Sequence, residues 1–278
     1  SYDEYENVTS MGLGVLLPDT VAADVLVILV ATGLVWVGSG WLEESAASIA
    51  THYGLPPIVQ GTLVVAIGSS FPEFASVVIA ARAGVFAIGV GAIVGSAVFN
   101  VLVVPAAAGL AGPDDKLEAS RAIVYKEAQF YMLAVSALVV TFALAVIYFP
   151  VSTDPIVGTM PRSLAVIPLA LYGLYLFIQY QDVGDARIDR VRGGVDVRRE
   201  WAKLGGGLAV IVVTVERLVA SVESLGVTFG VPEFLAGVTV VAAATSLPDT
   251  LVSVRTARED RAAPSLGDVL GSKTFDLL

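Results

Sequence analysis

Long apolar stretches alternate with short polar segments along this chain. They cover about residues 21–50, 57–83, 86–110, 119–149, 162–180, 204–225 and 232–257, and an eighth begins near residue 265. Each complete stretch is long enough to cross ~30 Å of hydrocarbon as a helix. Backbone groups in lipid must pair within their own segment, and the alternating pattern of a barrel is absent. The pattern therefore predicts an all-α polytopic membrane protein.

One segment of the chain occurs twice. A shift of 176 positions, without a gap, places Gly54–Asn100 on Gly230–Asp276. Such a long match without insertions indicates an internal duplication. The second copy begins five spans after the first, and five is an odd number, so we expect it to cross the membrane in the opposite sense. This is the inverted repeat of secondary transporters, whose binding site lies near the midplane.

The basic residues predict the orientation of the chain. Twelve of the sixteen Lys and Arg residues fall in three segments, 116–126, 187–203 and 255–261, which lie on one side of the predicted topology. The positive-inside rule makes that side cytoplasmic and puts the N-terminus outside a cell membrane. We divide the chain into a first repeat (1–111), two further spans (112–180), a cytoplasmic loop (181–203) and a second repeat (204–278).

Composition narrows the function classes. A formal net charge of −10 argues against nucleic acid as a partner, and the absence of cysteine excludes thiolate chemistry. No hydrolase motif or serine–histidine pair supports an enzyme. The partners we expect are the lipid bilayer and inorganic cations, with no cofactor and no protein partner implied.

Two acidic residues lie deep in apolar spans, each directly after a proline: Glu73 after Pro72, and Asp249 after Pro248. A carboxylate at such a depth costs ~2.5–3.5 kcal/mol even on the mild insertion scale, and neither has a basic residue close by in its own helix. Each proline also leaves a carbonyl oxygen four residues back without its helical hydrogen bond. A proline followed by an acidic residue occurs at matched positions of the two repeats, and this joint occurrence favours a functional role over a harmless helix kink.

Hydroxyl side chains share a helical face with each of these carboxylates, and a second pair of polar residues shares a face of the next span in each repeat. Ser69 and Ser70 precede Glu73, Thr245 and Ser246 precede Asp249, and the pairs Ser96/Asn100 and Ser272/Asp276 follow in the next span of each repeat. This set contains oxygen donors only. Oxygen-only sites select hard cations such as Ca²⁺, Mg²⁺ or Na⁺.

These motifs resemble those of the cation/calcium exchanger superfamily, most closely its sodium/calcium exchanger branch of prokaryotic type. The first repeat reads Gly68-Ser69-Ser70-Phe71-Pro72-Glu73 and Gly95-Ser96-Ala97-Val98-Phe99-Asn100, and the second reads Ala244-Thr245-Ser246-Leu247-Pro248-Asp249 and Gly271-Ser272-Lys273-Thr274-Phe275-Asp276. The resemblance implies an inverted-repeat exchanger fold with ten spans, of which eight are present here. Since the chain starts with serine and stops at Leu278 in an apolar run, we expect a processed or shortened form.

The resemblance also implies roles for the matching residues. Glu73 and Asp249 would be the central calcium ligands, and Ser69, Ser70, Thr245 and Ser246 would add oxygens for calcium and sodium. The carbonyls of Ala66 and Ala242, with Ser96 and Ser272, would complete flanking sodium positions, and Asn100 and Asp276 would close the centre.

Lys273 departs from the family pattern, since it puts an ammonium three residues before Asp276. One hypothesis makes it a tethered cation: three carboxylates and one lysine leave a site charge of −2, which one Ca²⁺ balances. The alternative is that it turns away and either snorkels to an interface or pairs elsewhere. Glu43 and Glu44, near the cytoplasmic end of the first span, are open to a cavity-lining or gating role or to solvation at the interface, and we expect solvation.

The sequence thus predicts a secondary active antiporter that exchanges Ca²⁺ for Na⁺ by alternating access. The nearest alternative is an H⁺- or K⁺-coupled calcium antiporter of the same fold. An alternative of another class is a membrane calcium sensor that does not transport.

Overall fold

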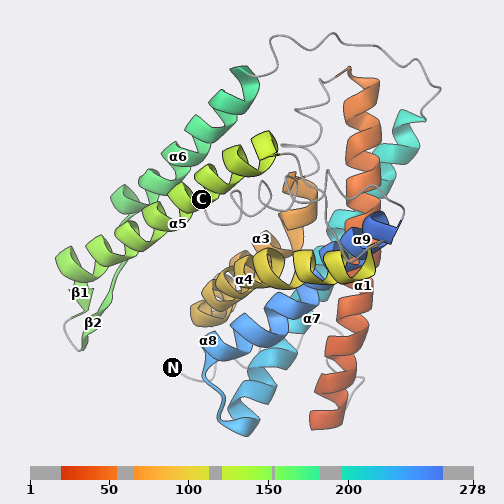
Figure 1. Ribbon diagram of the computed structural model, residues 1–278. Coiled ribbons are helices and arrows are strands. Elements are labelled where there is room, and N and C mark those ends of the chain that lie inside the picture. Colours follow the sequence, from red (N-terminus) through yellow and green to blue (C-terminus); the bar gives the residue numbers. More distant parts are fainter. Residues whose placement is uncertain (1–19, 55–65, 113–120, 152–153, 182–195, 259–278) are drawn as a thin grey trace.

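The structure, a computed structural model, describes residues 20–54, 66–112, 121–151, 154–181 and 196–258, and helices dominate it (Figure 1). Its elements in chain order are α1 (Val21–His52), α3 (Ala66–Ala83), α4 (Phe86–Ala111), α5 (Arg121–Tyr148), β1 (Pro150–Val151), β2 (Asp154–Gly158), α6 (Arg162–Gln181), α7 (Val197–Phe229), α8 (Glu233–Ala236), the π-helix η5 (Gly237–Val241) and α9 (Ala242–Arg258).

Apolar surface on these helices fits a bilayer. Within the described residues, four helical stretches are long and apolar enough to cross a membrane: Val21–His52, Phe86–Ala111, Ala128–Tyr148 and Glu233–Arg255. Large apolar side chains on them face outward, as Leu29 (66% exposed), Leu102 (63%) and Met132 (62%) do. Contiguous apolar surface of this kind marks a membrane contact rather than a water-exposed one. The predicted helical membrane protein is confirmed to this extent.

Helices α1 and α7 form a long antiparallel pair. Asp24, at the start of α1, accepts a 2.8 Å hydrogen bond from Ser224, near the end of α7, whereas Gly38 lies against Gly207, in the early part of α7. Figure 1 shows the two helices running in opposite directions across the molecule. A Cβ on Gly207 would lie 2.8 Å from the carbonyl oxygen of Gly38, so the missing side chains are what lets the two backbones approach so closely.

Both helices end in the same way, 176 positions apart. The chain leaves α1 through Gly54 with φ +71° and leaves α7 through Gly230 with φ +67°. This left-handed conformation disfavours residues with a Cβ, and glycine just after a helix is the usual residue that adopts it. Both copies of the duplicated sequence therefore begin with a glycine that terminates the preceding helix.

Helix α4 packs across the segment formed by α8, η5 and α9. A Cβ on Gly91 would collide with the carbonyl oxygen of Phe234, and one on Gly95 with that of Val238. A Cβ on Gly237 would collide in turn with the carbonyl oxygen of Ile88. Three glycines thus bring the backbones into contact, and this crossing determines where the polar residues of α4 and α9 meet. Figure 1 shows α4 lying across α9 near the centre of the molecule.

Between α5 and α6 the structure differs from the all-α prediction. β1 and β2 form a short antiparallel hairpin that pairs Pro150 with Gly158 and Val151 with Asp154. Pro150 cannot donate a hydrogen bond to continue α5, and a β-branched residue such as Val151 suits an extended strand. The apolar signal on both sides had hidden this two-stranded connection.

The predicted span boundaries need two corrections. Helix α7 begins at Val197, capped by Asp196, whose carboxylate accepts a hydrogen bond from the Arg199 amide, so residues 197–203 are helical rather than part of a loop. Its first turns are charged, which is why apolar periodicity placed the start near residue 204. The seventh predicted span is α8, η5 and α9 in succession rather than one regular helix. The eighth predicted span lies outside the described residues.

Candidate cation-binding site

The predicted acidic residue of the first repeat is fully buried between helices from both repeats. Glu73 on α3 has 0% exposure, and its Oε1 accepts hydrogen bonds from Ser96 on α4 at 3.0 Å and from Ser246 on α9 at 3.3 Å. The two serine hydroxyl oxygens lie 2.8 Å apart. Three side-chain oxygens from three helices therefore converge at one point.

The predicted acidic residue of the second repeat meets the amide of the first. Asn100 on α4 is fully buried, and its Nδ2 donates a 2.9 Å hydrogen bond to Oδ2 of Asp249, which is half-buried on α9. Because the amide nitrogen is used in this way, Asn100 Oδ1 stays available; it is buried and has no hydrogen-bond partner among the described residues. An available buried acceptor beside a carboxylate is suited to a cation.

These contacts bring the two carboxylates close together. Glu73 contacts Ser96, and Asp249 contacts Asn100, which follows Ser96 by four residues, or about 6 Å, on the same face of α4. On α9, Ser246 and Asp249 are three residues apart and likewise share a face. We call these five residues the central cluster: Glu73, Ser96, Asn100, Ser246 and Asp249.

Most of the other predicted ligands in the described residues are buried. Ser70 (0% exposed), Thr245 (1%) and Ala242 (0%) are buried, whereas Ser69 is half-buried. Thr245 donates to the carbonyl oxygen of Ala242 at 3.3 Å, so it packs onto its own helix in this conformation. Ala66 is the first residue of α3. The remaining predicted residues, Ser272, Lys273 and Asp276, lie outside the described residues.

Both prolines that were predicted to release a carbonyl oxygen lie next to a carboxylate of the cluster. Pro72 lies inside α3 and Pro248 inside α9, so each helix continues through its proline. Neither nitrogen can donate to the carbonyl four residues earlier, which leaves the oxygens of Gly68 and Ala244 without that helical bond.

The sequence did not reveal the π-helix η5, which ends directly before Ala242. A π-turn shifts the hydrogen-bond register of a helix and occurs often at functional sites. Gly237, which packs close to Gly91 of α4, was the available signal, although helical periodicity alone cannot distinguish a π-turn from an α-helix. Buried hydroxyls at Thr250 and Ser76 were also unpredicted, and both bond to backbone carbonyls of their own helices, at Ser246 and Glu73.

The donor set has a definite chemical preference. Carboxylates, hydroxyls, an amide oxygen and released carbonyls are hard ligands that suit Ca²⁺, Na⁺ or Mg²⁺. Within the described part of the chain, no three His, Cys, Asp or Glu side chains gather in one metal site. The cluster instead combines two carboxylates with neutral oxygens, which suits a cation that must be released again.

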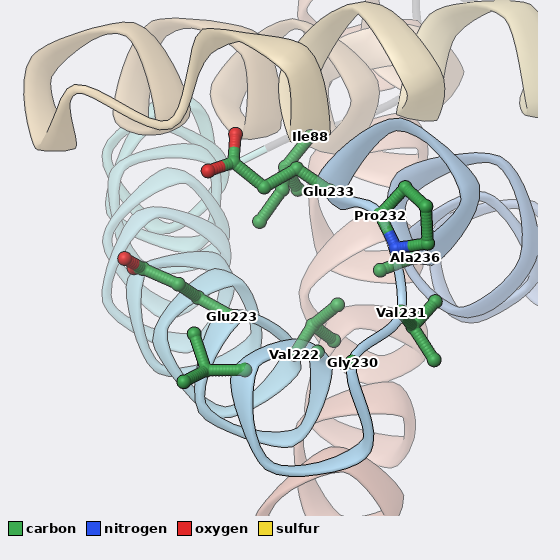
Figure 2. Close-up of a pocket in the computed structure, with 10 residues that line it drawn as sticks. Ile88, Val222, Glu223, Gly230, Val231, Pro232, Glu233 and Ala236 are labelled. Carbon is green, nitrogen blue, oxygen red and sulfur yellow. The ribbon is translucent and has the colours of Figure 1, made fainter.

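A separate pocket of about 310 Å³ lies away from the central cluster, between the end of α7 and the start of α8. Figure 2 shows the carboxylates of Glu223 and Glu233 extending toward the same side of it, with Pro232 and Val231 on the other side. None of the predicted site residues lines this pocket. Its walls are largely apolar, and it contributes no ligand to the cluster.

The fold and the cluster together define a class: a polytopic helical membrane protein with a buried, oxygen-lined centre for a hard cation. The chain belongs to the sodium/calcium exchanger protein family, whose model matches residues 23–181 and 200–278. It is therefore a member of a family of membrane antiporters, and this membership supports exchange of calcium for another cation.

Individual relatives agree with this placement. The chain is 28% identical over 248 residues to an uncharacterized membrane protein, MJ0091, of Methanocaldococcus jannaschii, with 88% of this chain and 75% of that protein covered. Among solved structures it resembles the sodium-calcium exchanger NCX_Mj (TM-score 0.60, 22% identity, 92% of this chain and 80% of that one). It also resembles the H⁺/Ca²⁺ exchanger CAX (TM-score 0.70, 17% identity, 91% and 65%). At these identities the two structures establish the fold alone.

Proposed function

We propose that this chain exchanges Ca²⁺ for Na⁺ across the cell membrane by alternating access, and that the central cluster holds the transported ions. The main support is the convergence of Glu73, Ser96 and Ser246, which come from both copies of the repeat yet lie within 3.3 Å of one another through their side-chain oxygens. A transporter that binds one cargo between two repeats needs this arrangement. The function is transport rather than enzymatic catalysis.

Competition for one set of oxygens is the proposed mechanism. A Ca²⁺ ion takes six to eight oxygen ligands, which the carboxylates of Glu73 and Asp249 and the oxygen of Asn100 begin to supply. Several Na⁺ ions would use the same carboxylates with the surrounding hydroxyls of Ser69, Ser70, Thr245, Ser272 and the carbonyls of Ala66 and Ala242. Without cargo, the acidic charge would be uncompensated in a low-dielectric interior, which disfavours the empty transition and enforces exchange.

The inverted repeat is part of this proposal. The antiparallel course of α1 and α7 supports it, since these helices occupy positions 176 residues apart and end in matched left-handed glycines. We assign the first repeat to 1–111 and the second, which begins with α7, to 197–278, with eight of ten spans present, the N-terminus outside and the segment 181–196 on the cytoplasmic side. Sliding of α1 and α7 over the other helices would expose the cluster to each side in turn.

A second candidate is the same exchange driven by H⁺ or K⁺. The likeness of the fold to an H⁺/Ca²⁺ exchanger gives this alternative its weight. In that case Glu73 and Asp249 would take up protons where the first proposal has them bind sodium. The two candidates differ in how calcium flux depends on the sodium gradient.

The test is ⁴⁵Ca²⁺ uptake into proteoliposomes loaded with Na⁺, K⁺ or choline, at several pH values. Uptake that requires internal Na⁺ at every pH supports sodium coupling. Uptake that follows a pH or K⁺ gradient without Na⁺ would assign the second candidate. Calcium binding without uptake under any gradient would identify a calcium sensor and refute both. Glu73→Gln is the control, because it keeps the side-chain size and removes the charge.

A further inference from the structure

Helix α1 carries an unexplained buried hydroxyl. Ser39 is 2% exposed, and its Oγ has no hydrogen-bond partner among the described residues. Serines inside helices usually bond back to a carbonyl of the preceding turn. Ser45, on the same helix and 0% exposed, does this: its Oγ donates to the carbonyl oxygens of Trp41 and Leu42 at 2.6 and 3.1 Å. A buried hydroxyl that avoids this bond indicates a ligand or water beside it.

Glu43 lies one turn after Ser39 on the same face of α1. Its predicted position was in interfacial solvent, but the structure shows it half-buried against α3, whereas the adjacent Glu44 is exposed. The Cγ atom of Glu43 lies 3.6 Å from where a Cβ of Gly68 would be, so its side chain reaches the α3 backbone at that glycine. Gly68 is the residue whose carbonyl Pro72 releases, so Glu43 borders the site motif directly.

Helix α3 links this position to the central cluster. Glu43 contacts Gly68, which lies five residues before Glu73 on α3, or about 7.5 Å along the helix axis. A carboxylate at this position adds negative potential on the path of a cation toward the cluster.

The helix geometry directs both groups to one point. A glutamate side chain on a helix extends back toward the N-terminus and covers the turn before its own Cα. The Glu43 carboxylate therefore reaches over the turn that contains Ser39, yet no hydrogen bond joins it to the Ser39 hydroxyl in the described part of the chain. A cation bound there would meet a hydroxyl oxygen from Ser39 and a carboxylate from Glu43.

We propose that Ser39 and Glu43 form a second cation subsite, between α1 and α3, that holds a partly hydrated Na⁺ or Ca²⁺ ion on its way to or from the central cluster. Two protein oxygens are too few for the six to eight ligands of a tightly bound calcium, so the ion keeps part of its water and binds transiently. This proposal rests on the exchange function proposed above. It gives α1 a direct contact with the transported ion.

Ser39 and Glu43 lie in the half of α1 that ends at His52, and Gly68 precedes Glu73 on α3, so we place the subsite on that side of the central cluster. Its removal should therefore slow transport from that side more than from the other. A merely structural role of Glu43 would impair transport from both sides and weaken equilibrium binding as well.

The chain offers matched controls for both residues. Glu43→Gln and Glu44→Gln remove the same charge from neighbouring positions, and Ser39→Ala and Ser45→Ala remove the same hydroxyl from two buried positions of α1. Each variant is reconstituted into right-side-out and inside-out vesicles, and the Ca²⁺ concentration for half-maximal ⁴⁵Ca²⁺ uptake is measured for each face. Equilibrium ⁴⁵Ca²⁺ binding to the purified protein reports the central cluster separately.

Glu43→Gln should raise the half-saturating Ca²⁺ about tenfold on one face, as expected for the loss of a charged partner, and leave equilibrium binding nearly unchanged. Ser39→Ala should shift the same face by a smaller factor, while Glu44→Gln and Ser45→Ala match wild type. The subsite proposal would be overturned if Glu43→Gln behaved like Glu44→Gln, or if it raised the half-saturating Ca²⁺ concentration equally on both faces. If Glu43→Gln does not fold, Ser39→Ala against Ser45→Ala decides in the same way.

Failure of the subsite is distinguishable from failure of the exchange function. In the first case wild type transports, Glu73→Gln does not, and Glu43→Gln has no one-sided effect. In the second case wild type itself shows no exchange under any cation gradient.

Discussion

Replacing Gly95 with alanine should weaken cargo binding without adding or removing a polar group. Gly95 lies where α4 crosses η5 and α9, directly before Ser96. A Cβ at this position would lie 2.6 Å from the Cβ of Ala242 and 2.7 Å from the Cα of Val238, and would collide with the Val238 carbonyl oxygen. Backbone atoms cannot rotate away, so the helices themselves must separate.

The size of the effect follows from these distances. Ordinary contact begins at 3.4 Å, so the helices must move apart by about 0.8 Å. A shift of that size along the line between the serines would lengthen the 2.8 Å contact of Ser96 with Ser246 to about 3.6 Å, beyond hydrogen-bond range. Overpacking of this kind costs ~1–3 kcal/mol, so a value near 2 kcal/mol would weaken calcium binding roughly thirtyfold.

Gly109 supplies the control for this experiment, because it lies on the same helix and, within the described residues, no atom outside its own helix turn lies within 4 Å of the position that a Cβ would take there. Calcium affinity is measured from sodium-gradient-driven ⁴⁵Ca²⁺ uptake, and thermal unfolding in detergent shows whether each variant folds. Gly95→Ala should raise the half-saturating calcium concentration, whereas Gly109→Ala should not. Equal affinities for the two variants would refute the claim that this helix crossing sets the geometry of the cluster.

Two further predictions concern charge and backbone conformation. Lys273→Asn should raise the number of Na⁺ ions exchanged per Ca²⁺ by about one, because it removes a cation that would otherwise balance a carboxylate; an unchanged reversal potential would reject the tethered-cation hypothesis. Gly230→Ala should lower the unfolding temperature, since φ is +67° there and a Cβ costs about 1 kcal/mol. Gly205→Ala should raise it slightly, because Gly205 lies inside α7 with open space around it. Shifts of the same sign at Gly230 and Gly205 would contradict this reasoning.

Much of the fold followed from hydropathy and from the repeat. Apolar length placed α1, α4, α5 and α6 to within about two residues of their ends, because lipid requires long uninterrupted apolar helices. The start of α7 and the β1–β2 hairpin were missed for a common reason. Hydropathy is averaged over a long window, so it does not detect the charged first turns of α7 or the short connection that begins at Pro150.

For the site, sequence supplied the residue types and structure supplied their partners. Matched prolines identified Glu73 and Asp249, but no periodicity could pair Ser246 with Glu73, which is 173 positions away. Glu43 shows the limit most clearly. Its sequence position suggested solvation at the interface, and only the contact with Gly68 brings it to the site motif.

The central claim is that one hard cation binds between Glu73 and Asp249, and an anomalous-scattering map from a crystal soaked in calcium tests it most directly. The account predicts a peak within about 2.3–2.6 Å of carboxylate oxygens from both residues, and its loss in Glu73→Gln. A map with no peak at the central cluster, or with calcium held only between Glu223 and Glu233 in the pocket of Figure 2, would contradict it.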